Sequence, residues 1–118
     1  MPRVAAARNT GQFESSMTRA IIQTFNAIDG VICQKIKGTA YGMPTLDIMG
    51  SKHGRFFWLE VKRPGRKPTL RQFSTINLWV ENEAVATWCT SLDAARRFIA
   101  IDWNTLTPEQ MIGGFHDE

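Results

Sequence analysis

Several classes of protein are excluded by what this 118-residue sequence lacks. No apolar run approaches the roughly 18 residues that a membrane-spanning helix needs, and the first residues lack the apolar stretch of a secretory signal, so we expect neither. The two cysteines, Cys33 and Cys89, lie far apart within apolar runs, and we expect them to be reduced residues of the core. The two histidines have no zinc-site spacing relative to them. Membrane proteins, disulfide scaffolds and zinc fingers are therefore excluded.

Acidic residues are scarce in the middle of the chain. From Val31 to Arg71 there are nine basic residues and two acids, Asp47 and Glu60, which gives this stretch a charge of +7. The remainder has five basic and nine acidic residues, a charge of −4, so the net charge is only +3. A basic centre favours a polyanionic partner, and nucleic acid above all. Charge alone leaves a solvated basic loop as the alternative.

The periodicity of apolar residues predicts a mixed α/β domain in which helices pack on a central sheet. The predicted elements are a helix over 12–29, strands over 31–37, 46–49 and 55–61, a helix capped by Thr69, a strand over 84–90 and a helix capped by Ser91. Glycines and a proline mark 38–44 as a loop. The order is thus α-β-β-β-α-β-α.

Three apolar patterns define the predicted core. The first helix carries Phe13, Met17, Ile21, Phe25 and Ile28 at helical spacing. The helix after Thr69 carries Leu70, Phe73, Ile76, Leu78 and Val80, and the last one carries Leu92, Ala95, Phe98 and Ile99. We expect residues 1–101 to form a single domain. Residues 102–118 are expected to be a C-terminal tail with a short helix after Thr107, which either packs on its own core or forms a dimer contact.

Two carboxylates are predicted to meet across a hairpin. If a two-residue turn at 53–54 joins the second and third strands, Asp47 lies opposite Glu60, with the Cβ atoms about 4.5–5.5 Å apart. Lys62 shares the face of Glu60, because side chains alternate along a strand. Opposed carboxylates repel each other unless a divalent cation lies between them, and such a cation would activate water for phosphodiester hydrolysis. The alternative interpretation is a cross-strand ion pair at the surface, either Glu–Lys or Asp–Lys.

Three segments resemble a known family. They read GMPTLDIMG at 42–50, GRFFWLEVKRPG at 54–65 and PTLRQ at 68–72. Together they resemble the VRR-NUC domain, the virus-type replication and repair branch of the PD-(D/E)XK nucleases, and the resemblance extends from about Glu14 to Ile99. It implies a restriction-endonuclease-like fold with a mixed central sheet flanked by helices. One departure is that Thr45 and Leu46 stand between Pro44 and Asp47, where the family usually has Gly-x-Pro-Asp.

The resemblance also implies a metal-dependent active site. Mg²⁺ or Mn²⁺ would be held by Glu14, Asp47, Glu60 and the backbone carbonyl of Val61. The catalytic residues implied are Asp47, Glu60, Lys62 and Gln72. Beside a phosphodiester site, we expect phosphate contacts from Lys37, Arg63, Arg66, Lys67 and Arg71.

The expected activity is metal-dependent endonucleolytic cleavage of DNA. Stand-alone domains of this family are typical of phages and include resolvases of four-way (Holliday) junctions, so branched DNA is the expected substrate and the cytoplasm of a bacterial host the expected location. Two symmetric incisions need two sites, which favours a homodimer. The alternative is a DNA-binding or packaging accessory protein of the same fold that is weakly active or inactive.

Overall fold

Helices cover both faces of a four-stranded mixed sheet in the computed structural model of this chain, which describes residues 2–37 and 45–117, with side chains from residue 13 onward. The elements are α1 (Pro2–Asn26), β1 (Val31–Lys35), β2 (Ile48–Lys52), β3 (Arg55–Val61), α2 (Leu70–Glu81), β4 (Val85–Cys89), α3 (Leu92–Ala100), the 3₁₀ helix η1 (Trp103–Thr105) and α4 (Pro108–Gly113). This order confirms the predicted α/β arrangement. Among the described helices, none combines the length and apolar character needed to cross a membrane.

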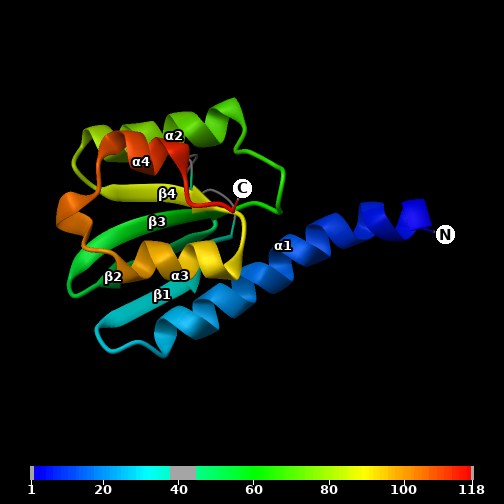
Figure 1. Cartoon of the computed structure of the whole chain (residues 1–118), viewed down its shortest axis with the longest axis horizontal. Coiled ribbons are helices and arrows are strands. Elements are labelled where there is room, and N and C mark those ends of the chain that lie inside the picture. Colours follow the sequence, from blue (N-terminus) through cyan, green and yellow to red (C-terminus); the bar gives the residue numbers. More distant parts are fainter. Residues whose placement is uncertain (1, 38–44, 118) are drawn as a thin grey trace.

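The sheet has the strand order β1-β2-β3-β4 (Figure 1). β2 pairs antiparallel with β1 and with β3, whereas β3 and β4 are parallel and are joined through α2. α1 and α3 pack together on one face, and α2 and α4 pack together on the other, mainly over β4. The N-terminal turns of α1 extend beyond the sheet (Figure 1). The strands therefore end between two helical layers.

The hairpin between β2 and β3 has the register that the sequence predicts. His53 and Gly54 form its two-residue turn with φ of 50° and 85°, and the pairing runs from Lys52 with Arg55 to Ile48 with Leu59. Left-handed φ values at both turn positions match the right-handed twist of the strands. Extended by one position beyond Ile48 and Leu59, the same register places Asp47 opposite Glu60.

The main core lies between the sheet and the layer of α1 and α3. Phe25, Phe57 and Phe98 are completely buried and contact one another edge to face, with ring centroids 6.0 Å apart for Phe25–Phe57 and 5.7 Å for Phe57–Phe98. Cys33 and Cys89 are buried and free, as predicted. Burial of these rings contributes on the order of 2–3 kcal/mol each relative to exposure, so the core fixes how the helices meet the sheet.

α1 is longer at its start and shorter at its end than the predicted 12–29. Three alanines before residue 8 extend it, because alanine has the highest helix propensity. At its end, the Asn26 side chain accepts from Cys33 N–H (2.8 Å) and donates to the Cys33 carbonyl (3.1 Å). The prediction that Phe13 and Ile28 face the core is wrong, since they are 49% and 39% exposed. Asn26 thus ends the helix and occupies the outer edge of β1.

Two leucines of α2 also differ from the prediction. Leu70 is 86% and Leu78 is 51% exposed, whereas Ile76 and Val80 are buried as predicted. Leu70 is the first residue of the helix, and Leu78 is rotated by about 200° from Ile76 around the helix axis. The strands are also shifted, since β1 ends at residue 35 rather than 37, β2 covers 48–52 rather than 46–49, and β4 covers 85–89. The predicted loop over 38–44 lies outside the described residues.

The C-terminal tail packs on its own chain. The Thr87 hydroxyl donates to the Met111 carbonyl (2.7 Å), and Trp88 Nε1 donates to the Ile112 carbonyl (2.9 Å). Phe115 then pairs in parallel with the end of β4: its N–H donates to the Trp88 carbonyl (2.8 Å) and its carbonyl accepts from Thr90 N–H (3.2 Å). Trp103 and Met111 of the tail are buried, and Ile112 and Phe115 are half-buried against the core, so the tail packs on its own chain.

Gly114 is expected to be essential for this packing. Its φ is +77°, and a Cβ at this position would overlap the Trp88 ring. Gly114→Ala should therefore lower the free energy of unfolding by about 2 kcal/mol or more, measured by urea denaturation. Gly113→Ala is the matched control, because an added methyl group there would meet no atom within 4 Å and the φ of Gly113 is not left-handed. Equal destabilisation by both variants would contradict this account of the tail.

Candidate active site

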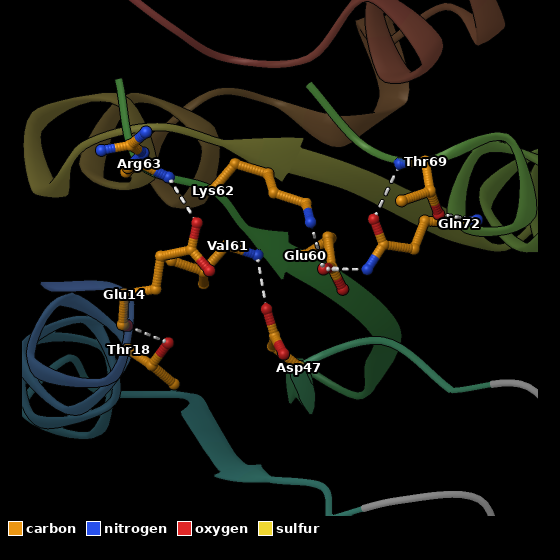
Figure 2. A network of polar contacts seen from close by, with 9 residues as sticks. All are labelled: Glu14, Thr18, Asp47, Glu60, Val61, Lys62, Arg63, Thr69 and Gln72. Carbon is orange, nitrogen blue, oxygen red and sulfur yellow. Dashed lines mark hydrogen bonds and ion pairs between the residues drawn. The ribbon is translucent and has the colours of Figure 1, made fainter. Parts of the chain in front are cut away.

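The residues predicted to be catalytic lie at one end of the sheet. β3 and β4 end there, whereas β2 begins there, and the loop after β3 leads to the first turn of α2. Figure 2 shows Asp47, Glu60, Lys62 and Gln72 around this end, with Glu14 approaching from α1. Strand direction therefore brings together side chains that are far apart in the sequence.

Asp47 is held by backbone groups on both of its neighbouring strands. Its Oδ2 accepts from Val61 N–H (2.8 Å), and its carbonyl accepts from Ile36 N–H (2.9 Å) (Figure 2 shows the first of these bonds). The preceding Leu46 is 2% exposed and belongs to the core. Leu46 is part of the two-residue departure from the family motif, and its burial anchors the chain immediately before Asp47. The motif residues 42–44 lie outside the described residues.

Glu60 is a buried carboxylate with two partners. The residue is only 3% exposed. Glu60 Oε2 accepts from Gln72 Nε2 at 2.7 Å and lies 3.7 Å from Lys62 Nζ (Figure 2). A buried carboxylate needs such partners, because leaving it without them costs several kcal/mol. Gln72 and Lys62 therefore fix the position of this oxygen.

The orientation of the Gln72 amide is set by the start of α2. Thr69 N–H donates to Gln72 Oε1 (2.9 Å), and Gln72 N–H donates to Thr69 Oγ1 (3.1 Å), so the two residues form a capping box. Because Oε1 accepts from Thr69, Nε2 is left to donate to Glu60. The sequence predicts Thr69 as a helix cap. Its role in orienting Gln72 is not among the predictions, although the Thr-x-x-Gln spacing signals it.

The site disfavours the ionised forms of both acids. Burial, followed by the negative charge of Asp47, raises the pKa of Glu60 to about 8. Burial also raises the pKa of Asp47, against the opposing effects of the Val61 N–H and of Lys62. Glu14 raises and Lys35 lowers the same pKa. Asp47 and Glu60 share a desolvated site, and burial outweighs the opposing effect of the nearby lysines, so the ionisation of both acids is unfavourable.

Glu14 reaches the site from α1. Its Oε2 accepts from Arg63 N–H at 3.1 Å, and its carbonyl accepts from the Thr18 hydroxyl at 2.7 Å (Figure 2). No sequence pattern signals the contact with Arg63, because it depends on how α1 packs beside the end of β3. Glu14 thus connects the first helix to the chain that follows Lys62.

Asp47 and Glu60 provide some, but not all, of the oxygen ligands that a hard divalent cation needs. Asp47 and Glu60 provide carboxylate oxygens at neighbouring positions, and oxygen ligands are those that Mg²⁺ and Mn²⁺ prefer. Within residues 13–37 and 45–117, however, no three Asp, Glu, His or Cys side chains gather closely enough to hold a metal. The described geometry therefore fits an ion held by the two acids together with water, with Glu14 directed at Arg63.

The basic residues predicted to bind DNA surround this end of the sheet. Lys37, Arg66, Lys67 and Arg71 are exposed, and Arg63 is half-buried beside Glu14. Lys35, which lies close enough to lower the pKa of Asp47, belongs to the basic stretch but is not among the predicted site residues. Its pairing with Ile48, next to Asp47, is the signal that could have identified it. The positive charge predicted from the sequence therefore borders the acidic pair.

Comparison with known proteins identifies the fold. No family model matches the sequence, and no curated protein matches it. A solved structure described as a "VRR_NUC domain" superposes with a TM-score of 0.64 at 19% identity, covering 73% of this chain and 92% of that chain. At this identity the likeness concerns the arrangement of helices and strands. The chain therefore has the fold of a VRR_NUC domain, as its three motif segments predict.

Proposed function

We propose that this protein is a metal-dependent DNA endonuclease whose active site consists of Asp47, Glu60, Lys62 and Gln72. The observation that carries the proposal is the placement of the buried Glu60 carboxylate beside the half-buried Asp47 carboxylate, with an ammonium group 3.7 Å from Glu60. An acid pair of this kind destabilises the fold unless something offsets its charge. The VRR_NUC fold and the basic surroundings support nucleic acid as the substrate.

The proposed roles follow from the contacts. Asp47, Glu60 and the Val61 carbonyl would hold Mg²⁺ or Mn²⁺, and Glu14 would contribute through water or by turning from Arg63. When bound, the ion supplies Lewis-acid polarisation of the phosphate and lowers the pKa of a water. Lys62 offsets negative charge developing on the phosphate. Gln72 keeps Glu60 Oε2 in place and leaves its other oxygen for the ion or a water.

The basic loop is proposed to bind the DNA backbone. Replacing Arg66 and Lys67 together by alanine should weaken binding and make its salt dependence shallower, by about one unit of log–log slope for each phosphate that is no longer neutralised. Both residues are exposed, so the double variant should fold normally. Arg96→Ala is the control, since Arg96 is an exposed residue of α3, on the other face, that pairs with Asp93. An unchanged slope in the double variant would show that Arg66 and Lys67 are solvated and do not contact phosphates.

Branched DNA, including four-way junctions, is the proposed substrate, and a homodimer is the proposed active form. The described part of each chain has one acid pair, whereas resolving a junction requires two incisions related by symmetry. Light scattering at micromolar concentration should give twice the 13.3 kDa chain mass. A particle that is monomeric alone and on junction DNA, and that produces single nicks, would contradict both the dimer and junction resolution. The nuclease proposal would be unaffected.

Substrate choice is tested with DNA molecules of equal length and composition. Linear duplex, flap and four-way junction substrates are incubated with the protein and Mn²⁺, and the products are mapped on denaturing gels. We expect paired, symmetric incisions in the junction and slower cleavage of the duplex. Equal rates on all three would reject structure selectivity, and no cleavage of any would reject the nuclease function.

A further inference from the structure

A surface cavity lies beside the candidate active site. It has a volume of about 190 Å³ and lies between the basic loop, the end of β4 and the C-terminal tail. Its walls are Gly65, Arg66 and Lys67 of the loop, Trp88 and Thr90 of the β4 end, and His116 and Asp117 of the tail. The tail returns to the loop after β3 at this point (Figure 1). Three segments distant in the sequence thus enclose one cavity.

Thr90 gives this cavity a hydrogen-bonding group that the fold does not use. The residue is 5% exposed, and its N–H donates to the Phe115 carbonyl, so its backbone is fixed. Among the described residues, no group forms a hydrogen bond with the Thr90 hydroxyl. The hydroxyl is not one of the buried unpaired atoms of the described residues, which are Trp58 Nε1 and Arg63 Nε, so it is accessible from the cavity that Thr90 lines. It is therefore available to donate a hydrogen bond to a ligand with an acceptor.

The charge in the cavity selects an anion. Arg66 and Lys67 have no ion pair with any acid of the described chain. Asp117 is the acid in the wall, and both of its oxygens are engaged: Oδ1 accepts from Arg97 Nη1 (3.0 Å) and Oδ2 from the Ser91 hydroxyl (2.8 Å). The charge of Asp117 is thus balanced by Arg97, and two cations remain.

The remaining wall is rigid and aromatic. The His116 ring stacks on Trp88 with centroids 5.2 Å apart and an interplanar angle of 17°. Its Nε2 lies 3.2 Å from the Gly113 carbonyl. Trp88 itself is fixed by its bond to the Ile112 carbonyl. This wall of the cavity is therefore fixed before any ligand enters, which lowers the entropic cost of binding.

The position of the cavity relates it to the acid pair. Trp88 pairs with Glu60 in the parallel ladder, and neighbouring strands lie about 4.8 Å apart. Thr90 is two residues further along, on the same face, about 6.6 Å from Trp88. Lys62 N–H donates to the Cys89 carbonyl at 2.9 Å, which holds the two strand ends together. A DNA strand that passes Glu60 would bring its next phosphates to this cavity.

We propose that this cavity binds a phosphate next to the cleaved one on the same DNA strand, through the Thr90 hydroxyl and the side chains of Arg66 and Lys67. The C-terminal tail is then part of the substrate site, because Phe115 fixes the backbone of Thr90 and because His116 and Asp117 line the cavity. The assignment of this phosphate to DNA rests on the proposed nuclease function. The proposal that the cavity binds a phosphate group does not depend on that function.

The first test uses inorganic phosphate alone. The melting temperature of the metal-free protein is measured in phosphate and in chloride at equal ionic strength. Because phosphate also stabilises proteins by exclusion from their surface, the readout is the difference between wild type and Thr90→Val, which keeps the shape of the side chain. We expect phosphate to raise the melting temperature of the wild type by an additional amount that is absent in Thr90→Val and in Arg66→Ala. Thr105→Val, in the exposed η1 turn, should keep it.

The second test distinguishes DNA from free phosphate as the source. Binding of a junction and of a duplex is measured in EDTA, and Thr90→Val should weaken it about tenfold, the scale of one hydrogen bond to a charged group. Arg66→Ala is the second variant, because Arg66 is exposed and its replacement cannot fail through loss of packing. Equal phosphate shifts in wild type and both variants would overturn the proposal.

The outcomes separate this inference from the nuclease proposal. If Thr90→Val loses the additional rise in melting temperature with phosphate but keeps its DNA affinity, the assignment to DNA is overturned and a site for free phosphate remains. Loss of both phosphate and DNA affinity in Thr90→Val, in a protein that does not cleave DNA with Mn²⁺, would support the phosphate site and reject catalysis.

Discussion

Asp47→Ala, Glu60→Ala and Lys62→Ala are each expected to abolish DNA cleavage and to leave DNA binding intact. The first two variants remove the carboxylates that would hold the metal, and the third removes the ammonium group 3.7 Å from Glu60. Loss of one charge-stabilising group costs at least about a hundredfold in rate, and loss of the metal costs more. Single-turnover cleavage and binding in EDTA measure the two properties separately. For the two acid variants, affinity is expected to stay equal or to rise, because a negative charge beside the DNA backbone is removed.

Glu81→Ala is the matched control for this experiment. It removes one carboxylate from the exposed end of α2, where Glu81 accepts from Asn77, and should not change cleavage. Wild-type turnover in Glu60→Ala, in preparations free of host nucleases, would show that the active site is elsewhere. A parallel loss of DNA binding and cleavage would assign Glu60 a structural role.

The metal-free protein is expected to lose stability as the pH rises from about 4.5 to about 8. In the folded protein, burial and the charge of Asp47 raise the pKa of Glu60 to about 8 from its usual 4.5. Between these values the native state keeps a proton that the unfolded state has released, so the free energy of unfolding falls with increasing pH. The dependence is on the order of 1.4 kcal/mol per unit of pKa difference. Asp47 acts in the same direction, since its pKa is raised too.

Urea denaturation in EDTA between pH 5 and pH 9 measures this effect. Glu60→Gln should flatten the profile and be more stable than the wild type at pH 8, because the neutral amide mimics the protonated acid. Mn²⁺ should stabilise the wild type most at high pH, since it binds the ionised form of the native state. A wild-type profile that is flat or rises over this range would contradict the electrostatic account of the acid pair.

The arrangement of the acid pair can be predicted from the sequence because it depends on local geometry. A two-residue turn at His53 and Gly54 fixes the pairing of β2 with β3, and the two-residue period places Glu60 and Lys62 on one face. Thr69 and Gln72 show their capping box as a four-residue pattern. Each of these features involves residues that are close in the sequence or are linked by one tight turn.

Features that depend on packing between distant elements cannot be predicted in this way. The bond from Arg63 N–H to Glu14 forms only after α1 packs beside the end of β3. The burial of Thr90 requires Phe115 to pair in parallel with the end of β4, and no local pattern encodes that pairing. Leu70 and Leu78 are predicted to be buried because they are apolar. Their positions on the helix direct both side chains to solvent instead, and apolar type alone does not determine burial.

The central claim is that the acid pair at the ends of β2 and β3 is a metal-dependent nuclease centre. The most direct measurement is the rate of DNA cleavage as a function of Mn²⁺ concentration, for wild type and Glu60→Gln purified in parallel. We predict a rate that rises and saturates with Mn²⁺ in the wild type, is absent in EDTA, and is absent at every concentration in Glu60→Gln. Equal cleavage by both proteins, or cleavage by the wild type in EDTA, would contradict the claim.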